Sequence, residues 1–328
     1  MLILNKKRKM LNYRLSIFNN AFNTIGSETS LQQELDDIRL GKYKSEINNC
    51  RIALIKEKNK ELYKKNKSKL KAVSFCGLFE NGRKLSNLSY YNNLIVIDID
   101  EIVNIEVVKD KLVKDRYVMA LWDSPSSKGL KGLIKVDSTI ENHKDFFFSL
   151  SIYFLQEYNI ELDKSGSDIT RLCYVSWDEN IYTNYESEIF KDIIAIPKKE
   201  YKGQEKEELY PPIISLNKSA FATEGLNKMA DRKQLKKIIN YLTNKKLSIT
   251  YNFSDWVKIA VIIANSFSYD IGENYFLTLC RLDGDAHNEM RSKELLKYCY
   301  NKRNLNHANQ ITFASLIYIT SQKGFLKK

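Results

Sequence analysis

Two aspartates at the end of an apolar run, Asp98 and Asp100, have the type and spacing that best suit chemistry. They lie two positions apart in residues 94–100, which read as a buried β-strand, so both side chains point to the same face. Two carboxylates held that close repel each other unless a cation lies between them, and Mg²⁺ or Mn²⁺ prefers oxygen ligands. The alternative is that both aspartates only end the strand and cap the next helix. The spacing favours the metal site.

A loop rich in small residues, 124–129, offers a second set of candidates. It joins two apolar runs, 117–122 and 130–136, that predict paired strands. Its backbone N–H groups and ammonium charges could surround a triphosphate. An ordinary hairpin loop would contain the same serines and glycines, and the segment does not match the Walker pattern. The candidate phosphate-binding residues here are Ser126, Ser127, Lys128 and Lys131.

A third group lies in residues 163–171, an acidic, hydroxyl-rich loop that leads into a predicted strand beginning at Arg171. Asp163 could complete a three-carboxylate metal site, and Arg171 could hold phosphate oxygens in a forked grip. Alternatively, Asp168 and Arg171 form a local ion pair while Asp163 caps a turn.

The net charge of +12 is concentrated near the N-terminus, because residues 1–90 hold 19 Lys and Arg against 8 Asp and Glu. A basic region of this kind suits a polyanionic partner, although solvated helix faces would give the same composition. Five cysteines show no zinc-ligand spacing, and no apolar run reaches the roughly 20 residues that span a bilayer. We therefore expect a soluble cytoplasmic protein without a membrane segment.

The sequence predicts an α+β fold. Helical periodicity precedes residue 70, β-type runs follow it, and helical periodicity returns after residue 225. Early helices are expected over 31–40 and 45–66, then helices over 103–114 and 142–158, and a strand over 171–177. A charged, proline-containing stretch reads as a linker. The predicted parts are a basic, mostly helical extension (1–70), a catalytic domain (71–195), the linker (196–225) and a small all-α domain (226–322). Helices in the last part are expected over 231–246, 254–266, 272–282, 290–302 and 310–321.

The order of these motifs resembles the archaeo-eukaryotic primase superfamily, in particular its bacterial mobile-element branch found ahead of virulence-associated-E-type helicases. The matching segments are residues 72–79, 94–100, 124–131 and 163–177, and residues 226–322 resemble the second type of primase C-terminal helical domain. The resemblance implies an RRM-like catalytic domain in which Asp98, Asp100 and Asp163 bind metal. Its second motif usually ends in a histidine that contacts the nucleotide, whereas this sequence has Lys131 there.

The resemblance implies a template-dependent nucleotidyltransferase, a DNA primase-polymerase that uses two divalent metals, Mg²⁺ or Mn²⁺, to make or extend primers. Its expected partners are single-stranded DNA, nucleoside triphosphates and a replicative helicase encoded separately. One alternative is an inactive primase-like module that binds single-stranded DNA or recruits a helicase, which the departure at Lys131 leaves open. A metal-dependent nuclease is the other, and it gives the loop from Asp163 to Arg171 no clear task.

Overall fold

The chain forms two compact units in the computed structural model, which describes residues 13–194, 215–305 and 311–326. The sheet unit comprises residues 1–147 and 162–192, and the helical unit comprises residues 148–161 and 193–328. The division falls inside helix α6 (His143–Tyr158), so this helix contributes its first turn to the sheet unit and the rest to the helical unit. The fold is thus α+β, with its strands in the first part of the chain.

The first sheet of the sheet unit has four antiparallel strands in the order β2-β1-β3-β9. Its strands are β1 (Arg14–Phe18), β2 (Ser27–Ser30), β3 (Ala72–Ser74) and β9 (Cys173–Tyr174). The prediction of a mostly helical segment before residue 70 is incomplete, because it missed β1 and β2. The polar sequence of β2 shows no apolar alternation, and its place is fixed by pairing with β1 and by an ion pair of 2.7 Å between Arg14 and Glu28. The strand predicted over 171–177 is limited to β9.

The second sheet has the order β10-β7-β8-β6 and carries the acidic motif. Its strands are β6 (Leu94–Ile99), β7 (Val118–Asp123), β8 (Leu130–Lys135) and β10 (Tyr182–Thr183). The three longer strands confirm the predicted runs. A separate hairpin pairs β4 (Gly77–Phe79) with β5 (Leu88–Tyr91), and between them lies the turn η2 (Leu85–Asn87).

The helices of the sheet unit are short. They are α2 (Leu31–Leu40), α3 (Lys44–Arg51), the π-helical turn η1 (Ile52–Lys56), α4 (Lys60–Lys67) and α5 (Ile105–Leu112). The single helix expected over 45–66 is interrupted, because Lys58 takes a left-handed conformation (φ 51°) and Asn59 then caps α4 through Leu62 N–H. A further turn, η3 (Lys164–Ser167), follows α6.

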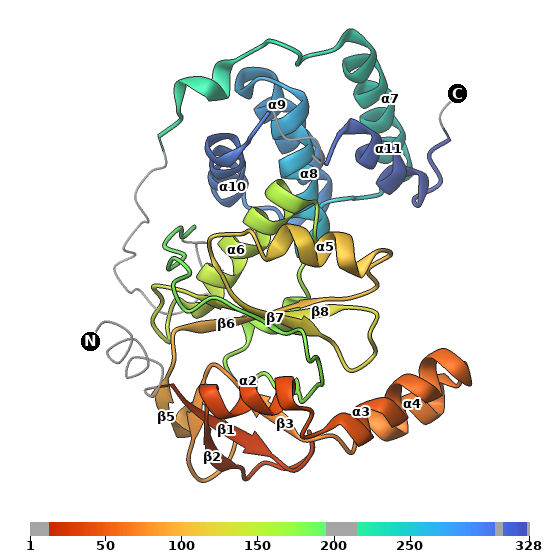
Figure 1. The fold of residues 1–328 in the computed structure, drawn as a ribbon. Helices are drawn as coiled ribbons and strands as arrows, with labels where there is room; N and C mark the ends of the chain where they lie inside the picture. The colour runs from red at the N-terminus through yellow and green to blue at the C-terminus, as the bar shows by residue number, and fades with distance from the viewer. Residues whose placement is uncertain (1–12, 195–214, 306–310, 327–328) are drawn as a thin grey trace. The chain divides into compact units, whose positions relative to one another are not determined.

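A shared core lies between the two four-stranded sheets, which Figure 1 shows as stacked layers. Val73 and Phe75 from the first layer meet Val96 and Trp122 from the second. In β6 the residues Leu94 and Val96 point into this core, so period-two alternation directs Asp98 to the same side. The acidic motif therefore begins where the apolar core ends.

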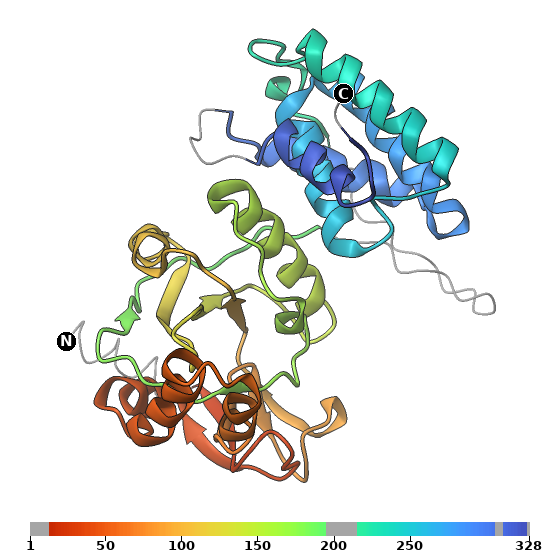
Figure 2. The same ribbon diagram turned by 90° about the vertical axis from the view of Figure 1, so that its right-hand side faces the viewer.

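The helical unit contains α-helices at the positions that the sequence predicted, within the residues that the structure describes (Figures 1 and 2). They are α7 (Met229–Lys245), α8 (Phe253–Ser266), α9 (Tyr269–Cys280), α10 (Glu289–Lys302) and α11 (Phe313–Ser321), with short turns η4 (Lys218–Phe221) and η5 (Arg281–Ala286). Most of the predicted linker, 196–225, lies outside the described residues. Among the described residues, none of the helices has the length and apolar character needed to cross a membrane.

Candidate metal centre

Three carboxylates from two separate segments meet at the end of β6. Asp98 is in the strand, Asp100 follows it directly, and Asp163 opens the turn η3 more than sixty residues later. The backbone N–H of Asp163 donates to the carbonyl of Asp98 at 2.9 Å, which fastens η3 to the free edge of β6. One ligand oxygen from each of the three side chains lies within 4.8 Å of the others. The arrangement could hold a metal ion.

Two glycines allow these segments to approach so closely. A Cβ atom on Gly166, in η3, would lie 2.6 Å from the carbonyl oxygen of Val96 and 2.6 Å from the ring of Phe147. A Cβ atom on Gly129, at the end of the loop between β7 and β8, would lie 2.3 Å from the carbonyl oxygen of Ile99. Any larger residue would push the backbone of β6 away at the point where it presents its carboxylates.

Lys131 is the direct partner of Asp98. The two residues face each other in the pairing of β8 with β6, and Lys131 Nζ donates to Asp98 Oδ2. Their side chains are 8 % and 15 % exposed, so this is a largely buried ion pair. Burial disfavours the ammonium form, but nearby acidic groups, including Asp98 and Asp100, outweigh burial and raise the pKa of Lys131. Lys131 is therefore charged at neutral pH.

The carboxylates show two features that a cation would satisfy. Asp98 Oδ1 is buried and has no hydrogen-bond partner among the residues that the structure describes. Burial, followed by repulsion from Asp98, raises the pKa of Asp100. A divalent ion would pair with the orphaned oxygen and relieve this repulsion, and a set of carboxylate oxygens suits Mg²⁺ or Mn²⁺. The residues present thus fit the expected metal.

Asp163 and Arg171 lie beside each other, 3.8 Å apart at Oδ2 and Nη2. Burial raises the pKa of Asp163, but hydrogen bonds from Ser165, one of them from its backbone N–H at 3.0 Å, and the charge of Arg171 hold that pKa below its ordinary value. Asp163 therefore both caps the turn and belongs to the carboxylate cluster. The carboxylate of Asp168 accepts instead from the backbone N–H and hydroxyl of Thr170, at 2.8 and 2.9 Å.

The loop between β7 and β8 is closed by its own hydrogen bonds. Ser127 N–H donates to the carbonyl of Ser124 at 3.0 Å, and Lys128 N–H donates to Ser126 Oγ at 3.1 Å. The side chain of Lys128 is exposed, and together with Ser127 it lines a surface hollow formed by residues 101–106. Two of the backbone N–H groups expected to surround a phosphate, those of Ser127 and Lys128, are thus engaged within the loop, and the ammonium of Lys128 lies on the surface.

Helix α4 contributes two site residues that the sequence reasoning missed, Tyr63 and Lys67. The Lys67 ammonium lies 5.8 Å from the ring centroid of Tyr63 and 5.3 Å from that of Tyr174. Burial and the charge of Lys131 lower the pKa of Lys67, while Asp98 and Asp100 oppose this effect. Spacing of four residues on a helix was the available signal, because it places both side chains on one face. It was hidden in a run of lysines that reads as uniformly solvated.

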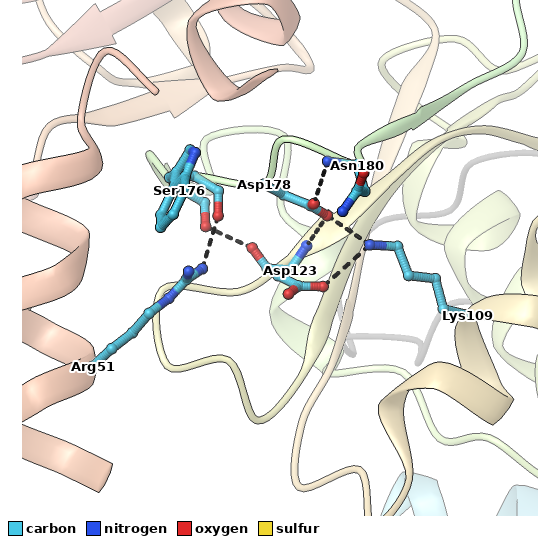
Figure 3. Close-up of polar contacts among 7 residues, drawn as sticks. Arg51, Lys109, Asp123, Ser176, Asp178 and Asn180 are labelled. Atoms are coloured by element: carbon cyan, nitrogen blue, oxygen red, sulfur yellow. Dashed lines mark hydrogen bonds and ion pairs between the residues drawn. The ribbon is translucent and has the colours of Figure 1, made fainter. Parts of the chain in front are cut away.

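A second polar network holds the end of β7, just before the loop between β7 and β8 (Figure 3). Lys109 Nζ lies 2.7 Å from Asp178 Oδ2 and 3.3 Å from Asp123 Oδ1, and the backbone N–H of Asp123 donates to Asp178 Oδ2 at 3.1 Å. Arg51 donates to the carbonyl of Trp177 at 2.8 Å. Because Asp123 is the last residue of β7, these contacts fix the start of the loop rather than form a further metal site.

Comparison with known proteins identifies one matching family. Residues 65–182 match the family model described as BT4734-like, N-terminal domain. The matched segment includes the three carboxylates, Lys67, Lys131 and Arg171, whereas Tyr63 lies just before it. Searches of curated proteins and of solved structures gave no match.

Proposed function

We propose that the sheet unit is a template-dependent nucleotidyltransferase of the DNA primase-polymerase kind, which makes or extends primers on single-stranded DNA. The observation that carries the proposal is the convergence of Asp98, Asp100 and Asp163, one carboxylate oxygen of each within 4.8 Å of the others. Divalent metal bound there would activate a primer hydroxyl and stabilise the leaving pyrophosphate.

The order of elements supports this proposal. β6, α5, β7, β8 and α6 follow one another as in the β-α-β-β-α-β motif of ferredoxin-like and RRM-like sheets, with β8 between β6 and β7. One feature differs. In that motif the last strand would pair with the edge of β6, whereas here the turn η3 and Asp163 lie at that edge. The variation brings the third carboxylate to the end of the strand that carries the other two.

The protein's own cations would bind the polyanionic substrates. Lys67 and Arg171 lie beside the carboxylates, come from different segments and could hold triphosphate oxygens. Ser126, Ser127 and Lys128 lie in the neighbouring loop, and an exposed ammonium such as that of Lys128 suits a phosphate of the nucleotide or template. The lysine-rich α4 would contact the backbone of single-stranded DNA. A helicase encoded separately remains the expected protein partner.

The test is nucleotide incorporation on single-stranded DNA, with and without a primer, in the presence of Mn²⁺ or Mg²⁺. Wild-type protein should form a product, and the Asp98→Ala/Asp100→Ala variant should lose it by at least a hundredfold. Asp110→Ala, which removes an exposed carboxylate of α5, is the matched control and should keep full activity. Wild-type protein that forms no product, or a product that survives loss of both aspartates, would refute the proposal.

The ion pair between Lys131 and Asp98 favours a second candidate, an inactive primase-like module that binds single-stranded DNA or recruits a helicase. Lys131 occupies Asp98 Oδ2 and supplies positive charge at the position that a metal would use. In that case the double aspartate variant binds DNA with unchanged affinity, and no Mn²⁺ concentration yields incorporation. Cleavage of labelled DNA in the absence of nucleotides would instead indicate a nuclease.

A further inference from the structure

The helical unit contains a cavity of about 280 Å³ that the proposed nucleotidyl transfer does not use. It lies where α8 and α10 begin, beside the turn η5. The residues that line it and matter here are Tyr251, Phe253, Trp256, Asp283, His287 and Arg291. All of them belong to the helical unit, so the cavity is complete within it.

One wall of the cavity is aromatic. Tyr251 is 76 % exposed, although a tyrosine usually finds apolar cover, and it precedes Asn252, which caps α8 through Asp255 N–H at 2.9 Å. Phe253 and Trp256 follow on the first turn of α8, with ring centroids 6.2 Å apart. The wall therefore combines the buried ring of Trp256 and the half-buried ring of Phe253 with one ring open to solvent, and such an open ring can stack a planar ligand.

The other wall is polar and cationic. The Arg291 guanidinium lies 5.0 Å from the ring centroid of Trp256, which holds it over the aromatic wall. His287 Nε2 is buried and has no hydrogen-bond partner within the described part of the chain, and its Nδ1 lies 3.5 Å from Ser292 Oγ. The Asp283 carboxylate accepts from Thr250 Oγ1 at 2.9 Å and from Ser248 Oγ, one bond on each oxygen, and keeps further lone pairs.

We propose that this cavity binds a nucleotide. A planar ring would stack on Tyr251, the ring of this wall that is open to solvent, with its polar edge satisfied by His287 and Asp283 and its phosphate held by Arg291. The volume lies just below the range of about 300–1,000 Å³ typical of drug-sized ligands, so it suits one base rather than a dinucleotide. A residue of single-stranded nucleic acid and a free nucleotide share this chemistry.

Photo-crosslinking of the full chain separates these two sources. One arm uses an oligonucleotide that contains iododeoxyuridine, and the other uses free iododeoxyuridine triphosphate, both in EDTA so that metal at the carboxylates plays no part. Mass spectrometry then locates the crosslink. The variants are Tyr251→Ala and Arg291→Gln, with Tyr318→Ala as the control, because Tyr318 is 68 % exposed in the same unit and does not line the cavity.

The proposal predicts a crosslink on Tyr251, Phe253 or Trp256, at least fivefold weaker in Arg291→Gln and unchanged in Tyr318→Ala. Tyr251→Ala, a change at an exposed side chain, should weaken affinity at least fivefold by fluorescence anisotropy of the same oligonucleotide or triphosphate. The arm that shows these effects identifies the source of the nucleotide. Crosslinks confined to other segments in both arms, or equal crosslinking and affinity in all variants, would overturn the proposal whatever the polymerase assay gives.

Discussion

Removing both partners of the Lys131–Asp98 ion pair should destabilise the sheet unit far less than the sum of the costs of removing each one alone. The side chains are 8 % and 15 % exposed, and loss of one leaves the other charge buried without its direct partner. Breaking a buried pair costs about 3–5 kcal/mol. Asp98→Asn should therefore cost about 3–5 kcal/mol, and Lys131→Met somewhat less, because Lys67 still acts on Asp98. The double variant should cost less than the sum of the two, with a coupling free energy of about 3 kcal/mol.

The assay is urea unfolding in EDTA, followed by tryptophan fluorescence in a Trp256→Phe background. Trp122 and Trp177 then report on the sheet unit alone, which avoids mixing its transition with that of the helical unit. Circular dichroism of each variant checks that the native fold is retained. Additive costs in the double-mutant cycle would refute the reasoning, since they would mean that the two charges do not interact in the folded protein.

Three further outcomes follow from the site and its supports. Mn²⁺ should raise the melting temperature of the wild-type protein but not of Asp163→Asn, and an equal rise in both would exclude Asp163 as a ligand. Gly129→Ala should lower the free energy of unfolding by about 1–3 kcal/mol, because its Cβ would lie 2.3 Å from the Ile99 carbonyl, and an unchanged urea midpoint would contradict this. Burial lowers the pKa of His143 from 6.5 to about 4, so the unfolded chain binds a proton that the folded chain does not between these values. Stability should be full above pH 6.5 and fall by about 3 kcal/mol towards pH 4, and His143→Asn, measured by the same fluorescence, should lack this component.

The acidic site was predictable because its signals are local. An apolar run ending in Asp98 and Asp100 defines a buried strand and the common face of both carboxylates. Asp163 could be named only as a candidate, since nothing near it in sequence shows that η3 docks on the edge of β6. That docking depends on a backbone hydrogen bond to Asp98 and on the space left by Gly166.

The direct contact between Lys131 and Asp98 was not predicted. The sequence pattern predicted that Lys131 binds phosphate. Its contact with Asp98 depends instead on the register between β8 and β6, strands that are not neighbours along the chain. Register is a property of the assembled sheet, set by the packing of the apolar faces. Lys67 was missed for a related reason, because its approach to the carboxylates depends on where α4 lies in three dimensions.

The strands β1 and β2 show the limit of periodicity. β1 is short, and the sequence of β2, Ser-Glu-Thr-Ser, resembles a turn. Both owe their conformation to pairing in a sheet whose other members, β3 and β9, come from distant parts of the chain. The helices of the helical unit were easier to predict from sequence, since the apolar face of an amphipathic helix is visible within a few turns.

The most direct test of the central claim is a crystal structure of the protein with Mn²⁺ and a non-hydrolysable nucleoside triphosphate, analysed by anomalous scattering. We predict Mn²⁺ bound by Asp98, Asp100 and Asp163, with the triphosphate on that metal and within reach of Lys67 and Arg171. Lys131 should no longer donate to Asp98 Oδ2, or it should share the Asp98 carboxylate with the ion. A carboxylate cluster without Mn²⁺ at saturating concentration, with Lys131 still paired to Asp98, would contradict the account.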